Sequence, residues 1–275
     1  MPDGSRDTDR LEQLFSQVEA AWDAVATKAV VAADVNDDLE SIMTFLALMR
    51  VRGPAMRDAI EVFMAQSARA TLKHLEATGA LPPMDHLSDR AREALRPENL
   101  EIAVDPHRSL WAMPHAMEGI ALVLDSLGYF FVHNETSTDF ITSDNPVIYF
   151  DARPAEADIL PYTVVPGQPI ELLFPVSPRL LLIGHTDFRA RFELGGMWHS
   201  PLKEVEKVKR VNRLVARFGY RLLFAKDRRH EALVQKYAAQ SPVPSFMSGS
   251  HGTGQFLLTQ MVFGPRPPKP KYRLE

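Results

Sequence analysis

Residues 140–150, FITSDNPVIYF, place a group of polar residues between two apolar runs. Short apolar runs broken by Ser, Asp, Asn and Pro are typical of β-strands joined by a turn. Asp144 can accept hydrogen bonds from backbone amides two residues further on, and Asn145 is held away from the helical region because Pro146 follows it. The stretch therefore predicts either an Asx-type turn between two strands or a polar site built on that turn.

Further apolar runs predict the other strands of a sheet. They lie at residues 129–134, 139–143, 171–177, 179–185, 220–225 and 256–263. Polar turns connect the first pair and the second pair, and a mostly antiparallel sheet is the simplest arrangement of such runs. The stretch SGSHGTGQ, residues 248–255, predicts a flexible loop, because it lacks the Lys-Ser/Thr pair and the preceding strand of a phosphate-binding loop.

Helical periodicity dominates the first third of the chain. Apolar residues recur there at helical spacing, and Gly-Pro, Gly and Pro-Pro sequences end the segments. The predicted helices of the whole chain span residues 11–29, 39–52, 54–78, 88–96, 114–127, 202–218 and 228–240. Because helices come first and strands later, the sequence predicts an α+β fold, with an N-terminal helical layer packed on a mainly antiparallel β-sheet.

Length and composition indicate a globular protein. The chain has 275 residues, of which 45% are hydrophobic and 24% charged, so it can bury a large core. We predict a disordered lead over residues 1–9 and a single α+β domain over residues 10–263. Residues 264–275 are rich in Pro and basic side chains, which predicts an extended, solvated tail that can dock a protein partner.

Residue types and charge exclude several kinds of site. The chain has no cysteine, which excludes disulfides, thiol catalysis and Cys-based metal sites. A net charge of -4 and a pI of about 6.2 argue against nucleic acid as a partner. The chain opens without a signal-peptide h-region, and no apolar run is long enough to span a bilayer. We therefore expect a cytoplasmic protein with no membrane partner.

Several motifs in order along the chain carry a family resemblance. They are LEQLFSQVEAAWDAV at 11–25, FLALMRVRGPAMRDAI at 45–60, FITSDNPV at 140–147, FPVSPRLLLI at 174–183 and VNRLVARFGYRLLFA at 211–225. Together they resemble a bacterial domain-of-unknown-function family, DUF 4238. The resemblance implies a mixed fold, with helices beside a sheet, and no established activity.

One departure from the family concerns the N-terminus. Members of that family usually carry a His-His-x-x-Pro segment ahead of the first helix, and nothing of this type precedes Leu11. The chain is then divergent, or truncated, or its gene start is assigned too late. If those histidines form a site in relatives, we expect this protein to lack that site.

Arg50 is the first candidate for a binding residue. At helical spacing it falls between Met43 and Leu46, inside the apolar stripe of its helix. A guanidinium in that position requires a carboxylate, and Asp144 or Glu19 can supply it. The alternative is that Arg50 extends to water and complements the C-terminal end of the helix.

Asn212 is the second candidate, and with the turn it completes a polar centre. Helical projection places Asn212 on the apolar face of its helix, toward the sheet, where its amide must find partners. It can either hold the turn of Ser143, Asp144 and Asn145 or bind a ligand. We predict that Arg50, Asp144, Asn145 and Asn212 lie near one another.

Two functions are compatible with this centre. In the first, Arg50, Ser143, Asp144, Asn145, Asn212 and Glu19 bind or help to hydrolyse an anionic small molecule or nucleotide, with Asp144 as the candidate catalytic residue. In the second, the same residues form a buried hydrogen-bond network in a structural or protein-interaction module. The sequence identifies neither a cofactor nor an enzyme class, and its histidines lack the matched spacing of a metal site.

Overall fold

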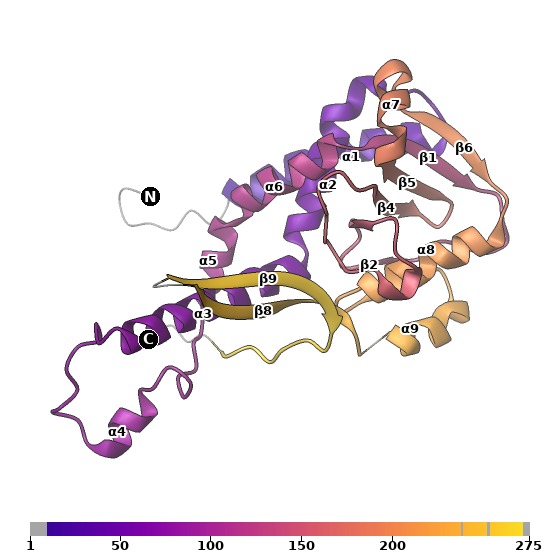
Figure 1. Cartoon of the computed structure of the whole chain (residues 1–275). Helices are drawn as coiled ribbons and strands as arrows, with labels where there is room; N and C mark the ends of the chain where they lie inside the picture. Colours follow the sequence, from indigo (N-terminus) through magenta and orange to yellow (C-terminus); the bar gives the residue numbers. More distant parts are fainter. Residues whose placement is uncertain (1–9, 238, 252–253, 272–275) are drawn as a thin grey trace.

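The computed structural model describes residues 10–237, 239–251 and 254–271. The predicted lead, residues 1–9, lies outside them. The N-terminal third is helical, as predicted, and most strands follow it (Figure 1). The helices are α1 (Arg10–Val30), α2 (Leu39–Arg52), α3 (Pro54–Ala77), α4 (Asp89–Ala94), α5 (Pro106–Trp111), α6 (Met113–Asp125), α7 (Arg189–Gly195), α8 (Val205–Phe218) and α9 (Glu231–Tyr237).

The main sheet has five strands in the order β3-β4-β5-β1-β6. Its strands are β1 (Gly128–Asn134), β3 (Ile148–Asp151), β4 (Ile170–Ser177), β5 (Leu180–His185) and β6 (Trp198–Leu202). Neighbouring strands are antiparallel except for β1 and β6, which are parallel. The prediction of an α+β fold with a mainly antiparallel sheet is confirmed.

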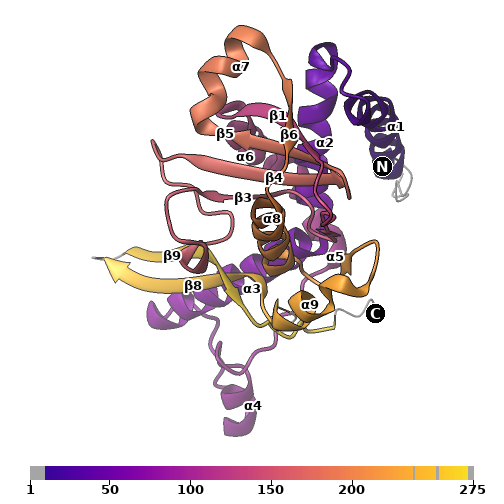
Figure 2. The same ribbon diagram turned by 90° about the vertical axis from the view of Figure 1, so that its right-hand side faces the viewer.

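The ribbon of the main sheet is seen from another side in Figure 2. Side chains of its strands alternate between two apolar clusters on opposite faces. In β1, Tyr129 and Phe131 belong to the cluster with α1, α2 and α6, whereas Val132 belongs to the cluster with α8. Leu172 and Leu173 of β4 divide in the same way. This period of two follows from the pleat of a strand. The N-terminal helical layer therefore covers one face, as predicted, and α8 covers the other.

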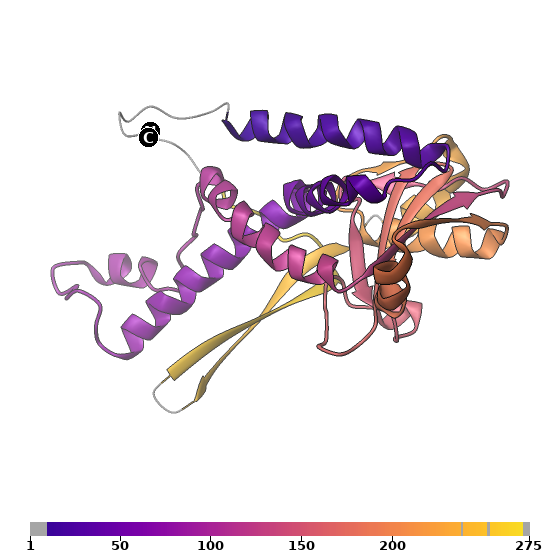
Figure 3. The same ribbon diagram turned by 90° about the horizontal axis from the view of Figure 1, so that it is seen from above.

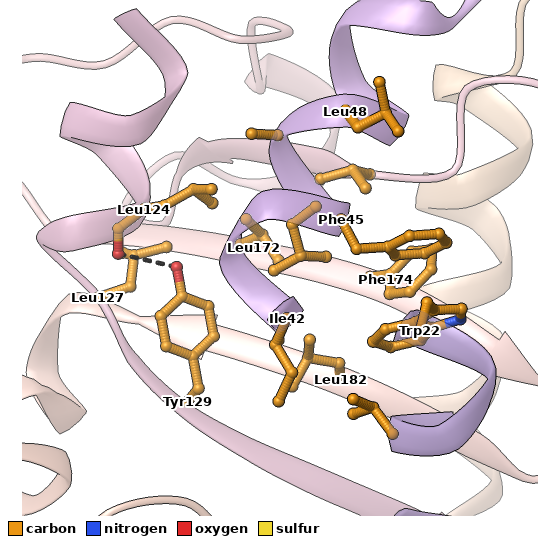
Figure 4. Packing of buried hydrophobic residues seen from close by; sticks show 14 of the residues in the cluster. Trp22, Ile42, Phe45, Leu48, Leu124, Leu127, Tyr129, Leu172, Phe174 and Leu182 are labelled. Atoms are coloured by element: carbon orange, nitrogen blue, oxygen red, sulfur yellow. Dashed lines mark hydrogen bonds between the residues drawn. The ribbon is translucent and has the colours of Figure 1, made fainter. Parts of the chain in front are cut away.

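Aromatic residues fix the N-terminal helices to the sheet. Trp22 of α1 and Phe45 of α2 stack with a centroid distance of 4.3 Å and an interplanar angle of 2° (Figure 4). Phe174 of β4 lies 5.6 Å from Trp22 and 6.0 Å from Phe45, at a tilted angle. Tyr129 donates a hydrogen bond of 2.8 Å to the carbonyl of Leu124, which ties β1 to the end of α6. Such aromatic contacts add to the free energy of burial itself.

A second sheet forms a long two-stranded ribbon of β8 (Ser241–His251) and β9 (Gly254–Gly264). Figure 3 shows the ribbon and α3 extending away from the main sheet. The predicted strand at residues 256–263 is confirmed. The predicted loop at residues 248–255 is wrong where it is described, since β8 runs to His251 and β9 starts at Gly254; residues 252–253 lie outside the described residues.

Other differences from the sequence-based expectation have local causes. Helices α5 and α7 and strand β6 were not expected, because each is short and carries polar or Pro residues. The Pro of β6, Pro201, is tolerated because β6 is an edge strand of the sheet. The expected hairpin of residues 129–134 with residues 139–143 is wrong, because β1 pairs with β5 and β6. The division of the chain at residues 10, 263 and 264 stays a prediction.

None of the helices that the structure describes has the length and apolar character needed to cross a bilayer.

Candidate functional site

The stretch FITSDNP forms a buried turn that joins two sheets. Thr142 and Ser143 make up strand β2 (Thr142–Ser143), which pairs with β7 (Leu223–Phe224) in a small antiparallel sheet, and β3 of the main sheet follows. The hydroxyl of Ser143 accepts a hydrogen bond of 3.1 Å from the amide of Asn145. Ser143 is 4% exposed, so this local bond satisfies a buried hydroxyl. The turn predicted from the sequence is present, with Ser143 as the residue that closes it.

Asp144 holds the turn to the end of α8. Its two carboxylate oxygens accept hydrogen bonds from the amides of Tyr220 and Arg221, at 3.0 and 2.9 Å. Its own amide donates to the carbonyl of Leu222 at 3.1 Å. These partners lie far along the chain rather than two residues on, as the sequence had suggested. Asp144 therefore acts as an anchor between β2 and the segment after α8.

Arg50 lies in the last turn of α2 and is 3% exposed. Its guanidinium carbon is 3.5 Å from the centroid of the Tyr162 ring, a cation–π contact. Nε and Nη1 of Arg50 are buried without a hydrogen-bond partner among the described residues. Arg50 forms no ion pair with Asp144 or Glu19 among the described residues, so the expected pairing is wrong. Its burial also contradicts an extension to water, but its place in the last turn of α2 agrees with the second part of that alternative, a charge that complements the helix end.

Tyr162 and Asn145 complete the surroundings of Arg50. Asn145 donates one hydrogen bond of 2.5 Å to the hydroxyl of Tyr162 and another of 2.9 Å to the carbonyl of Phe218. Its Oδ1, however, is buried and has no donor among the described residues. Burial raises the pKa of Tyr162 to about 12, although the charge of Arg50 opposes that shift. Tyr162 is therefore a neutral phenol at physiological pH.

Gly53 brings α2 close to the turn. A Cβ built on Gly53 would lie 3.3 Å from the carbonyl oxygen of Asp144 and 3.6 Å from Oδ1 of Asn145. The start of α3 and the end of α2 thus sit directly against the turn. Arg50 and Asn145 both contact Tyr162, and Gly53 lies against Asp144 and Asn145. A common site of Arg50, Asp144, Asn145 and Asn212 stays a prediction.

Asn212 binds the backbone of residues 139–141, the segment just before the turn. It is 2% exposed on α8, accepts a hydrogen bond of 3.1 Å from the amide of Ile141 and donates one of 2.9 Å to the carbonyl of Asp139. The orientation toward the sheet, expected from helical projection, is confirmed. Its amide group is engaged by backbone next to the turn rather than by Ser143, Asp144 or Asn145.

Glu19 belongs to a different pair. Its carboxylate contacts the guanidinium of Arg52, two positions after Arg50, and the side chains of both partners are about half exposed. An exposed pair of this kind contributes only about 0–1 kcal/mol. Sequence spacing alone could not tell which of the two arginines of α2 faces α1.

Within the part of the chain that the structure describes, Arg50 has no counter-ion and Oδ1 of Asn145 has no donor. Among the candidates, Ser143, Asp144, Asn212 and Glu19 all have protein partners, and only Arg50 and Asn145 keep open hydrogen-bonding capacity. Within the described part of the chain, no group of three His, Asp or Glu side chains is arranged to hold a metal ion. Tyr162 was missed because its segment, residues 152–169, has no periodic signal.

Most of the chain, including this site, matches one protein family. The family described as "Protein of unknown function (DUF4238)" matches residues 1–229. The chain belongs to this family. The DUF4238 match covers the Arg50 site and its surroundings but stops before α9, so the ribbon and the tail lie outside it. Neither the comparison with curated proteins nor that with solved structures gives a match.

For this DUF4238 protein, the contacts of Asp144 lead to a stability prediction. We expect Asp144→Asn to lower the free energy of unfolding by about 2 kcal/mol, because the new amide NH₂ faces a backbone N–H and leaves it unsatisfied. The melting temperature should fall by about 4–8 °C. Thermal unfolding followed by circular dichroism measures this, with the exposed Asp37→Asn as control. Equal melting temperatures for wild type and Asp144→Asn would contradict the anchoring role.

Proposed function

We propose that this protein binds a small anionic ligand through Arg50 and does not act chemically on it. The observation that carries the proposal is the buried guanidinium of Arg50, whose Nε and Nη1 have no partner among the described residues. Arginine stays protonated in proteins, so its charge persists at this position. A buried charge without a counter-ion costs several kcal/mol, and a bound anion would remove that cost.

The shape of the site favours a particular class of anion. Nε and Nη1 carry charged N–H donors that point to opposite sides of the Nε–Cζ bond, and each can donate to an oxygen of a carboxylate or phosphate. The guanidinium carbon lies 3.5 Å from the centroid of the Tyr162 ring, which fixes the position of these donors. Oδ1 of Asn145 adds an acceptor that requires a donor. A carboxylate or phosphate with a neighbouring hydroxyl would satisfy both residues.

Binding is better supported than hydrolysis. Asp144 is the candidate general base, but each of its carboxylate oxygens already accepts a backbone N–H. These two bonds occupy both oxygens and hold the carboxylate in place as part of the turn. Tyr162 is a neutral phenol with a pKa raised to about 12, which makes it a poor general base. The Arg50 site therefore supports recognition of an anion without a residue poised for proton transfer.

The test is a thermal-shift experiment on wild type, Arg50→Met and Arg52→Met. The ligands are inorganic phosphate, nucleoside monophosphates and hydroxycarboxylates. A ligand at a hundredfold excess over its Kd stabilises the folded state by about 2.7 kcal/mol. We expect a rise in melting temperature for wild type and for Arg52→Met, since Arg52 is half exposed and pairs with Glu19. Arg50→Met should show no rise.

The same variants separate binding from a purely structural role. If Arg50 awaits an anion, Arg50→Met without ligand should melt at or above the wild-type temperature, because an unpaired buried charge has been removed. If Arg50 only completes a buried network with Tyr162, Arg50→Met should melt lower, and no anion should stabilise the wild type. That second result would overturn the proposal and favour the structural alternative, which the satisfied contacts of Asp144 and Asn212 already support for those two residues.

A further inference from the structure

An acidic pair on α3 lies outside the Arg50 site. Asp58 and Glu61 are each 8% exposed, and they sit three positions apart on the same helix face. Asp58 accepts hydrogen bonds through Oδ2 from the hydroxyl of Tyr220 at 2.7 Å and from Arg221 Nη2 at 2.9 Å. Glu61 accepts a long bond of 3.4 Å from Ser109. Two adjacent buried carboxylates repel each other unless a cation lies between them.

Lys269 of the C-terminal tail supplies that cation. Its Nζ is 2.6 Å from Oδ1 of Asp58 and also contacts Oε2 of Glu61. Burial alone would raise the pKa of Asp58, but hydrogen bonds from Lys269 and Tyr220 bring that pKa below its ordinary value. The expected solvated tail is therefore held against α3 by one lysine placed between two carboxylates.

The rest of the tail is held loosely. Figure 1 shows it turning back from the end of β9 toward α3. Arg266 donates to the carbonyl of Tyr220, while the described tail backbone, residues 265–271, makes no hydrogen bond with the body. Pro267, Pro268 and Pro270 form one wall of a cavity of about 160 Å³ against α3. Proline-rich chains form such extended contacts at low entropic cost, because the proline ring fixes φ and the extended conformation is formed before binding.

We propose that Asp58, Glu61 and Tyr220 form a recognition site for a lysine flanked by prolines in an extended segment of a partner protein, and that the chain's own tail occupies this site until the partner displaces it. The chemistry of the occupant is that of residues 265–271, PRPPKPK. Aromatic and proline contacts around an extended peptide are a general mode of recognition, and the two carboxylates add selectivity for lysine. This inference does not depend on the Arg50 site.

The tail should compete with a free peptide for the site formed by Asp58, Glu61 and Tyr220. A segment tethered near its site acts at an effective concentration of about millimolar, so it competes strongly with any free peptide. A labelled PRPPKPK peptide should therefore bind weakly to the wild-type chain. It should bind at least about tenfold more tightly to full-length Lys269→Met, in which the tail no longer offers its ammonium group. Equal binding to both proteins, or binding to neither, would overturn the proposal.

Variants of the peptide and of the site test whether binding depends on the lysine at position 269 and on Glu61. A peptide that carries the Lys269→Met change should not bind, whereas one that carries Lys271→Met should bind normally, because among the described residues Asp58 and Glu61 both pair with Lys269 and neither pairs with Lys271. Adding Glu61→Gln to the Lys269→Met protein should remove binding of the parent peptide. If the Lys269→Met peptide binds as well as the parent peptide, lysine recognition is refuted.

A measurement on the unmodified protein covers the case in which a variant fails to fold. Lysine acylation followed by mass spectrometry should show Lys269 reacting several-fold more slowly than Lys271, since Lys269 is held between Asp58 and Glu61. Excess PRPPKPK peptide should raise the reactivity of Lys269 to that of Lys271. Protection of Lys269 that persists with the peptide would show a permanent structural contact. A dimer formed by tail exchange, seen by light scattering, would equally refute a separate partner.

Discussion

Asn212→Ala is expected to lower the free energy of unfolding by about 3 kcal/mol, the larger part of it from two orphaned backbone groups. In the wild type, Oδ1 of Asn212 accepts from the amide of Ile141 and Nδ2 donates to the carbonyl of Asp139, and Asn212 is 2% exposed. Water cannot easily replace these contacts, because α8 covers the sheet at this point. The alanine therefore leaves one buried N–H and one buried C=O without partners.

The comparison that tests this uses three variants and chemical denaturation. Lys209→Ala lies on the exposed face of the same helix and should change stability by less than about 0.5 kcal/mol. Asn212→Asp keeps the acceptor but loses the donor, and it places a carboxylate near the buried Asp139, so it should destabilise at least as much as Asn212→Ala. An Asn212→Ala protein as stable as Lys209→Ala would show that these two bonds contribute nothing measurable.

The orientation of Asn212 was predictable because it depends on one helix alone. Its position follows from a period of 3.6 residues, and the same rule places Trp22, Ile42 and Phe45 in the core. The strands at β1, β4 and β5 were predictable for a similar reason, since apolar residues occupy both faces of a sheet that helices cover on both sides. Fold class follows from such local signals.

The partners of the site residues were less predictable, because they depend on distant segments. Asp144 binds amides 76 and 77 positions away, and Arg50 lies against Tyr162, which belongs to a stretch without periodicity. Four of the six candidate side chains are buried: Arg50, Ser143, Asn145 and Asn212. The choice between Arg50 and Arg52 for Glu19, however, needed the packing of α1 on α2. Burial can be estimated from one helix; pairing needs the tertiary fold.

In the ribbon of β8 and β9, the local preferences of the residues predicted the wrong structure. Gly, Ser and His in residues 248–255 favour a loop by local propensity, yet Gly249 is accommodated in β8, where the ring of Phe256 from β9 covers it. A cross-strand aromatic side chain can compensate for a glycine in a strand. The register of the ribbon thus overrides the preference of single residues, and no pattern within one strand reveals it.

Gly128→Ala is the second substitution with a large expected effect, about 3 kcal/mol of destabilisation. Gly128 begins β1, opposite His185 of β5, where the chain leaves α6 and enters the sheet. A Cβ at this position would overlap the carbonyl group of Phe188 and lie 2.7 Å from the amide nitrogen of Arg189. These are backbone atoms at the start of α7. The overlap can therefore be removed only if β1 or the whole segment after β5 moves.

Gly119→Ala provides the matched control, because it places the same methyl group on an exposed position of α6 with no atom within 4 Å. Alanine favours a helix over glycine by about 0.5–1 kcal/mol, so Gly119→Ala should raise the melting temperature while Gly128→Ala lowers it by about 6–12 °C. Hydrogen exchange should locate the loss in β1, β5 and α7. Gly119→Ala gains helix propensity without a clash, whereas Gly128→Ala meets the backbone of Phe188 and Arg189. A stable Gly128→Ala protein would mean that β1 and α7 do not approach as closely as the structure has them.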